Sequence, residues 1–194
     1  MKTTRIGLLG GTFNPVHIGH MVIAQTALDK AGLDRVIFVP CHEPPHKKIP
    51  HLASARDRLA MIRLAVAENP RFDVSDVEVR RAGRSYTIDT VRHFRDLYKG
   101  KAKLHFIIGG DSFAALSAWH CIDEIARIVT FIVVNRPGYE TKRSKIKAVS
   151  IVMPGLDISS SKLRQRVAEG KSIRYLVPDP VVRYIERKNI YAKK

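Results

Sequence analysis

The sequence of 194 residues has few acidic residues, few cysteines and no long apolar run. Its 34 lysines and arginines exceed its 18 aspartates and glutamates, and the formal net charge of +16 favours anionic ligands. The two cysteines, Cys41 and Cys121, form no CxxC motif and are expected to be free thiols. Because no apolar run approaches the roughly 20 residues of a membrane helix, and residues 6–9 are too short for a signal-peptide core, we expect a cytoplasmic protein without membrane contact.

Short apolar runs alternate with helical patterns along the chain. The runs at 6–9, 36–40, 104–108, 128–134 and 149–152 predict buried strands, and residues 72–79 predict one strand or two with a break near Ser75. Helical patterns at 21–33, after Ser54 and from about 85 to 98 make the strands parallel, joined by right-handed crossovers. We therefore expect an α/β fold in one domain over residues 1–194, with a helical C-terminal part from about residue 158.

The stretch from residue 10 to 20, GGTFNPVHIGH, connects the first strand to the first helix. Gly10 and Gly11 are expected to let the backbone turn sharply and a ligand approach the main chain. The N-terminus of the following helix would present free N–H groups and a positive dipole end, which suits phosphate. His17 and His20 are three residues apart and would share one face of the first helical turn. The stretch predicts a phosphate site that also carries two imidazoles.

Residues 40–52 are rich in proline, histidine and lysine, and predict a loop at the C-terminal end of the second strand. Parallel sheets bind ligands at that edge, so Lys47 and His46 could reach an anion, although a solvated connection is the simpler interpretation. The spacing of the histidines in this loop fits no standard metal site, and we predict none.

Other polar residues follow predicted strands or begin predicted helices. Thr87 begins a helix and is expected to cap it, or to bind a ligand. Asp111 follows a buried strand and Gly109, where it could cap a helix or bind a ribose. Trp119, the only tryptophan, could stack on a planar ligand or simply pack in the core. Lys162 and Arg164 follow three serines at a helix start, where cations are disfavoured, which indicates a compensating anion such as phosphate.

These motifs, in this order and spacing, resemble those of the bacterial nicotinate-nucleotide adenylyltransferases in the HxGH nucleotidyltransferase superfamily. The signature stretch at 10–20 and its ISSSKLR partner at 158–164 carry the resemblance. Pro44-Pro45-His46-Lys47, the segment RSYTIDT at 84–90, Gly109, Asp111, Trp119, RPGY at 136–139 and SIRYLVP at 172–178 extend it over nearly the whole chain.

The resemblance implies a Rossmann-like, doubly wound parallel sheet of about five to six strands. It implies that the enzyme transfers the adenylyl group of ATP to nicotinate mononucleotide, giving deamido-NAD and pyrophosphate in NAD biosynthesis, with Mg²⁺ carried by the nucleotide rather than by a protein site. It assigns catalysis to His17 and His20. The ATP contacts that it implies are Gly10, Gly11, Thr12, Phe13, His17, His20, Lys47, Gly109, Asp111, Ser160 and Arg164. The mononucleotide contacts that it implies are Asn14, Lys47, Thr87, Trp119 and His120.

Three residues depart from the family pattern. Gly110 stands where alanine or serine is usual, His120 where tyrosine is usual, and Ser161 where threonine is usual. An adenylyltransferase that prefers nicotinamide mononucleotide remains an alternative, since the sequence does not show which atoms face the ring. A basic nucleic-acid-binding protein is a distant alternative that would explain the charge but not the two histidines. The oligomeric state stays open, a homodimer included.

Overall fold

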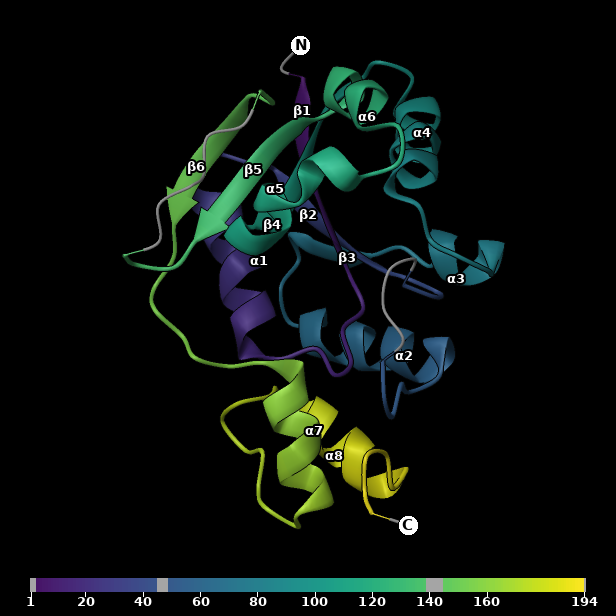
Figure 1. Cartoon of the computed structure of the whole chain (residues 1–194), viewed down its shortest axis with the longest axis vertical. Coiled ribbons are helices and arrows are strands. Elements are labelled where there is room, and N and C mark those ends of the chain that lie inside the picture. The colour runs from purple at the N-terminus through teal and green to yellow at the C-terminus, as the bar shows by residue number, and fades with distance from the viewer. Residues whose placement is uncertain (1–2, 45–48, 139–144, 194) are drawn as a thin grey trace.

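In a computed structural model of the chain, which describes residues 3–44, 49–138 and 145–193, a six-stranded parallel sheet forms the centre. The strands are β1 (Thr4–Gly11), β2 (Arg35–Pro40), β3 (Phe72–Val74), β4 (Ala102–Gly109), β5 (Thr130–Asn135) and β6 (Ala148–Val152). Their order is β3-β2-β1-β4-β5-β6 (Figure 1). The order reverses between β1 and β4, and doubly wound sheets bind ligands at such a point. The predicted α/β class, parallel pairing and strand number are confirmed.

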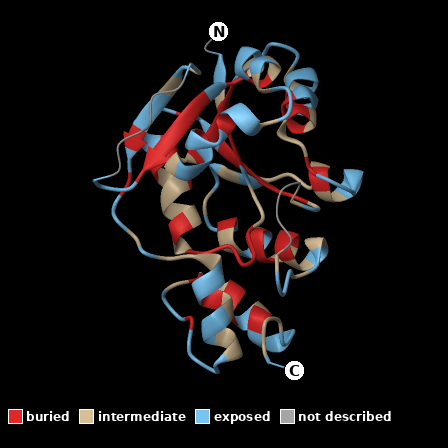
Figure 2. Ribbon diagram, viewed as in Figure 1, coloured by how far each residue is buried: buried red, intermediate tan, exposed pale blue. Residues whose placement is uncertain are grey.

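Helices cover both faces of the sheet. One face packs against α1 (Ile18–Lys30) and α2 (Ala55–Val66), and the same apolar core extends to α7 (Ser160–Ala168) and to α8 (Asp179–Arg187), which packs on α2. The other packs against α4 (Thr87–Tyr98), α5 (Gly110–Ala114) and α6 (Ile122–Ile128), with a short 3-10 turn at Leu116–Ala118. The burial of the central strands between these layers is visible in Figure 2.

Alternation along β1 shows how the sequence builds the two layers. Ile6 and Leu8 join the core beside α4, whereas Leu9 joins the core beside α1 and α2. Successive strand residues point to opposite faces, so an uninterrupted apolar run is what a strand covered on both sides requires. Burial of the apolar runs on both faces therefore fixes β1 and β4 within the sheet, and with them the positions of their ends.

One predicted strand is partly wrong. Only Phe72–Val74 is extended, and Val77–Arg81 forms the short helix α3. Asp76 precedes this helix and forms an i,i+4 ion pair with Arg80 at 2.8 Å, which favours a helical turn over an extended one. The alternating valines, which suggested a strand, were outweighed by this local pairing and by burial of Glu78.

Serine side chains cap the starts of α2 and α7. The Ser54 hydroxyl accepts from the Asp57 N–H at 3.0 Å, and the Ser159 hydroxyl accepts from the Lys162 N–H at 3.3 Å. The anion beside Lys162, however, is the Asp157 carboxylate at 2.7 Å, which corrects the expectation that this lysine indicates phosphate. Within the described residues, no helix has the length and apolar character to cross a bilayer.

Candidate active site

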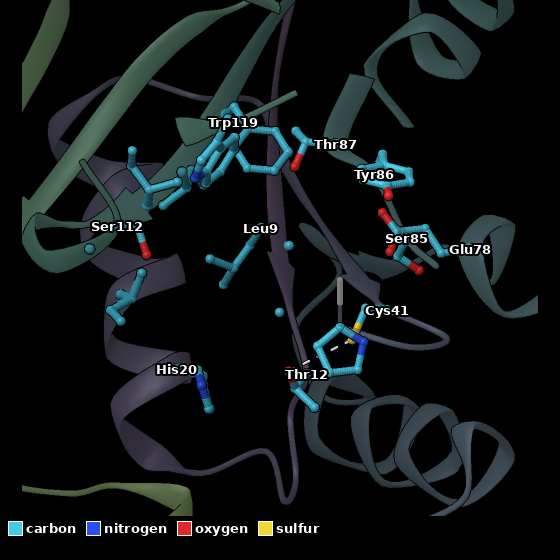
Figure 3. Close-up of a pocket in the computed structure, with 18 of the residues that line it drawn as sticks. Leu9, Thr12, His20, Cys41, Glu78, Ser85, Tyr86, Thr87, Ser112 and Trp119 are labelled. Atoms are coloured by element: carbon cyan, nitrogen blue, oxygen red, sulfur yellow. Dashed lines mark hydrogen bonds between the residues drawn. The ribbon is translucent and has the colours of Figure 1, made fainter. Parts of the chain in front are cut away.

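A cavity of about 430 Å³ lies at the carboxyl ends of β1 and β4, where the strand order reverses. Figure 3 shows Thr12 and His20 towards one end of it and Trp119 and Thr87 towards the other. The predicted site residues that line it are Gly10, Gly11, Thr12, His20, Thr87, Gly109, Trp119 and His120. The fold thus brings predicted residues from β1, α1, α4, β4 and the segment after the 3-10 turn to one cavity.

Gly10 and Gly11 leave room for neighbouring rings and do not form the sharp turn that the sequence predicted. Both belong to β1, and neither has a positive φ; the left-handed residue is Phe13, with φ 49°. A Cβ on Gly10 would lie 3.0 Å from the Phe106 ring, and one on Gly11 would lie 3.0 Å from the Phe13 ring. The glycines therefore let aromatic rings pack closely beneath the loop that follows β1.

His17 and His20 stack on each other at the start of α1, with ring centroids 3.8 Å apart. The His17 N–H donates to Nδ1 of His20 at 3.2 Å, so a neutral His20 carries its proton on Nε2. Phe13 packs edge-on against His20 at 4.9 Å. The predicted shared face is confirmed, and His20 is the member of the pair that lines the cavity.

Burial keeps both imidazoles uncharged near neutral pH. Desolvation, aided by the positive charge of Arg136, lowers the pKa of His17 to about 4. Desolvation and the neighbouring His17 hold the pKa of His20 well below its ordinary value. The pair therefore offers neutral N–H donors, and fixed cations elsewhere must supply positive charge.

Gly19 allows the histidine pair to form. A Cβ at this position would lie 3.0 Å from Nδ1 and 3.1 Å from Cε1 of His17. These distances are tighter than ordinary contacts, so a larger residue would push the His17 ring aside. The glycine between the two histidines is required by packing.

Aromatic residues form the opposite wall. Trp119 is braced edge-on by Phe106 at 5.8 Å and by Phe131 at 6.3 Å. Tyr86 and His120 approach each other at 5.3 Å. Thr87 is the first residue of α4, so the positive end of this helix faces the same wall. A planar ring with an anionic substituent fits such a wall.

The turn after β4 departs from its prediction in one respect. Gly109 lines the cavity, but Asp111 is exposed in the first turn of α5 and does not, whereas the neighbouring Ser112 does. A Cβ on Gly110 would lie 2.6 Å from Oδ1 of Asn135, so the lack of a side chain at Gly110 leaves room for the asparagine on β5. Ribose binding by Asp111 remains a prediction.

The signature stretch at 10–20 is held in place by hydrogen bonds of three predicted site residues, Asn14, Ser160 and Arg164. Asn14 is buried; its side chain accepts from the Ala53 N–H at 3.0 Å and from the Tyr191 hydroxyl at 2.6 Å. The Ser160 hydroxyl donates to the Pro15 carbonyl at 2.9 Å, and Arg164 donates to the Asn14 carbonyl at 2.9 Å. Substrate contacts by these three side chains stay predictions.

The remaining predicted residues lie elsewhere. Phe13 and His17 are buried beneath the cavity lining, and Lys47 lies outside the described residues. Cys41 and Cys121 are free thiols, as expected. Among the described residues, no group of three or more His, Cys, Asp or Glu could hold a metal ion.

The sequence did not single out three residues at or beneath the cavity. Glu78 and Cys41 line it, and burial raises the pKa of each. Arg58 lies beneath it, fully buried. A signal for Arg58 exists, because it shares the apolar stripe of α2 with Ile62 and Val66 at four-residue spacing. A charged residue on such a stripe indicates a buried polar role.

Comparison with known proteins gives a consistent result. Residues 8–166 match the family described as cytidylyltransferase-like. A protein of Shouchella clausii named probable nicotinate-nucleotide adenylyltransferase is 46% identical over 96% of both chains. One of the same name from Saccharopolyspora erythraea is 44% identical, covering 98% of this chain and 91% of its own. In structure, the nicotinic acid mononucleotide adenylyltransferase of Plasmodium falciparum, solved with NaAD, superimposes with a TM-score of 0.79 over 97% of each chain at 19% identity, and so shares the fold. The chain therefore belongs to the cytidylyltransferase-like family and, within it, to the nicotinate-nucleotide adenylyltransferases.

Proposed function

We propose that the protein transfers the adenylyl group of ATP to nicotinate mononucleotide, giving nicotinate adenine dinucleotide and pyrophosphate. The observation that carries the proposal is a single cavity with a phosphate-type loop and His20 at one end and Trp119 with the start of α4 at the other. Two nucleotides can meet in such a cavity with their phosphates between the two ends. Membership of the adenylyltransferase family supports the same reaction.

The chemistry requires positioning rather than a covalent intermediate. A phosphate oxygen of the mononucleotide attacks the α-phosphorus of ATP, the bond to the bridging oxygen breaks, and pyrophosphate leaves with that electron pair. Catalysis of this kind consists mainly of alignment and of stabilising charge on the phosphate oxygens. His20, and His17 beside it, would donate neutral N–H groups to those oxygens.

Positive charge comes from residues around the loop. Arg164 bonds the Asn14 carbonyl and Arg136 lies close enough to depress the pKa of His17, so both would act on the triphosphate. Lys47 is proposed as a further cation from the loop after β2. Mg²⁺ would enter bound to the phosphates of ATP as part of the substrate.

The end of the cavity that would bind the mononucleotide, here called the acceptor end, favours a carboxylate over an amide on the pyridine ring. The first-turn N–H groups of α4 at Thr87 and the backbone at His120 would donate to the nicotinate carboxylate, and the helix dipole adds to this preference. Trp119 would stack on the pyridine ring. The protein would act as a cytoplasmic enzyme on free nucleotides, without nucleic acid or membrane.

Pyrophosphate release from ATP with each mononucleotide tests the proposal. We expect kcat/KM for nicotinate mononucleotide to exceed that for the nicotinamide form by at least about tenfold, a difference of roughly 1.4 kcal/mol. Trp119→Ala should raise KM for the mononucleotide far more than KM for ATP, whereas His20→Ala should lower kcat with both substrates saturating.

Ser172→Ala, which removes one hydrogen bond from an exposed serine outside the cavity lining, is the control for both variants. Preference for the amide would overturn the acid assignment. A His20→Ala protein with full activity would overturn the mechanism.

A further inference from the structure

Arg58 is a fully buried cation that the reaction as proposed does not use. Its guanidinium donates to four backbone carbonyls: Nη1 to Thr12 at 2.9 Å and to Cys41 at 2.6 Å, Nη2 to His42 at 2.7 Å, and Nε to Ala53 at 3.1 Å. Four of the five N–H donors of an arginine are thereby satisfied. One side chain thus fixes the loop after β1 and both ends of the loop after β2.

Ser85 forms a second junction on the acceptor side. Its hydroxyl accepts from the His42 N–H at 2.9 Å, and its own N–H donates to the Glu43 carbonyl at 3.0 Å. The same hydroxyl hydrogen-bonds the buried carboxyl group of Glu78, which also receives the Thr90 hydroxyl of α4. Ser85 is therefore tied both to the loop after β2 and to the helix whose first turn faces the cavity.

His42 joins the two junctions through its backbone. Its carbonyl accepts from Arg58 and its N–H donates to Ser85. A continuous hydrogen-bonded path consequently runs from Thr12, at the phosphate end of the cavity, to Ser85, which adjoins Tyr86 and Thr87 at the acceptor end. Cys41, Ser85 and Thr12 all line the cavity, so the path follows one of its walls (Figure 3).

We propose that Arg58 and Ser85 are positioning residues that couple the two ends of the cavity, so that binding of ATP strengthens binding of the mononucleotide and the reverse. This inference rests on the proposed function, because it takes the two nucleotides as the ligands. A ligand that orders Thr12 also orders Cys41 and His42 through Arg58, and the second ligand then loses less conformational freedom when it binds. Linkage requires the coupling to be equal in both directions.

A purely structural role would give a different result. If the path only stabilised the fold, breaking it would lower stability and affect the two nucleotides independently. If the path couples the ends, a break would reduce the mutual effect of the ligands while each still binds alone. The coupling factor, which is the factor by which one ligand changes the affinity for the other, therefore separates the two interpretations.

The test is calorimetric binding of a non-hydrolysable ATP analogue with and without saturating nicotinate mononucleotide. For the unmodified protein we expect the mononucleotide to tighten analogue binding by about 5-fold or more. Ser85→Ala should reduce the factor to about 1, because it removes both hydrogen bonds of the hydroxyl, and Ser85→Thr should retain it. Arg58→Lys should also abolish it, since an ammonium group cannot span four carbonyls.

Ser172→Ala is the matched control, because its hydroxyl likewise accepts one backbone N–H, from Arg174 at 3.2 Å, away from the path. It should keep the full coupling factor. No coupling in the unmodified protein, or the same coupling in Ser85→Ala, would overturn the inference. Pyrophosphate release is measured separately, so failure of the adenylyl transfer itself would count against the proposed function and not against the coupling.

Discussion

Acidification should destabilise the fold through His17. The side chain is buried, and its pKa of about 4 lies below the value of 6.5 of an unfolded chain. Between these two values the unfolded protein binds a proton that the folded protein excludes. The free energy of unfolding therefore falls as pH decreases through this window, and the contribution of neutral His17 is fully present only above about pH 6.5.

The magnitude follows from the two pKa values. Their full difference corresponds to roughly 3 kcal/mol, of which about 2 kcal/mol is lost between pH 6.5 and 4.5. Domains have only about 5–15 kcal/mol of stability in total. His20 adds to the loss in the same direction, because burial also depresses its pKa. Glu78 acts the other way, since its raised pKa favours folding at low pH.

Urea unfolding at pH 6.5 and 4.5, for the unmodified protein and for His17→Gln, isolates this contribution. Glutamine cannot be protonated, so the variant should lose about 2 kcal/mol less over the interval. With a slope of roughly 2 kcal/mol per M, that difference moves the urea midpoint by about 1 M. Parallel losses in the two proteins, or an NMR titration that places the pKa of His17 near 6.5, would refute the reasoning.

Three further predictions concern the glycines and the metal. Gly19→Ala should displace the His17 ring and lower kcat about tenfold with little change in melting temperature, as steady-state kinetics and calorimetry can show; unchanged kcat would contradict the close approach. Gly110→Ala should cost about 1–3 kcal/mol in urea unfolding because its Cβ would meet Oδ1 of Asn135, and an unmoved midpoint would mean that the space is larger than it is here. EDTA should abolish adenylyl transfer yet leave the melting temperature of the free protein unchanged, whereas a lowered melting temperature would indicate a resident ion.

The strands and the location of the site followed from local patterns in the sequence. Apolar runs bounded by glycine or proline are sufficient to predict buried parallel strands, and ligands bind beyond their carboxyl ends. The same logic failed at residues 77–81, where valines alternate but Asp76 and Arg80 stabilise a helical turn. Local ion pairing outweighed β-propensity there, since the segment lies beyond the end of a three-residue edge strand.

Individual side-chain contacts could not be predicted from the sequence, whether the residues are near or far apart in the chain. The partner of Lys162 is Asp157, five residues away, although its place at a helix start indicated phosphate. Gly10 and Gly11 are small because of the rings of Phe106 and Phe13, which no turn motif reveals. Such spatial neighbours are set by the packing of separate elements, which carries no local signature.

The internal bonds of the signature loop were likewise beyond the sequence. Asn14 was assigned to substrate by resemblance alone, and only the fold shows that the Tyr191 hydroxyl and the Ala53 N–H occupy its oxygen. The four carbonyl acceptors of Arg58 come from two loops that no periodicity connects. Only the stripe of α2 indicated that this arginine faces inward.

The bonds behind the signature loop have a consequence for biosynthesis. Ile18 donates to the Leu176 carbonyl, and Asn14 and Pro15 are secured by Ser160, Arg164 and Tyr191, which follow 145 to 177 residues later in the chain. At about 5–20 residues per second, a ribosome delivers these anchors roughly 7 to 35 seconds after the loop. A nascent chain can therefore form its first crossover long before its histidine pair is supported, and competence for the reaction waits until residues 160–191 have been made.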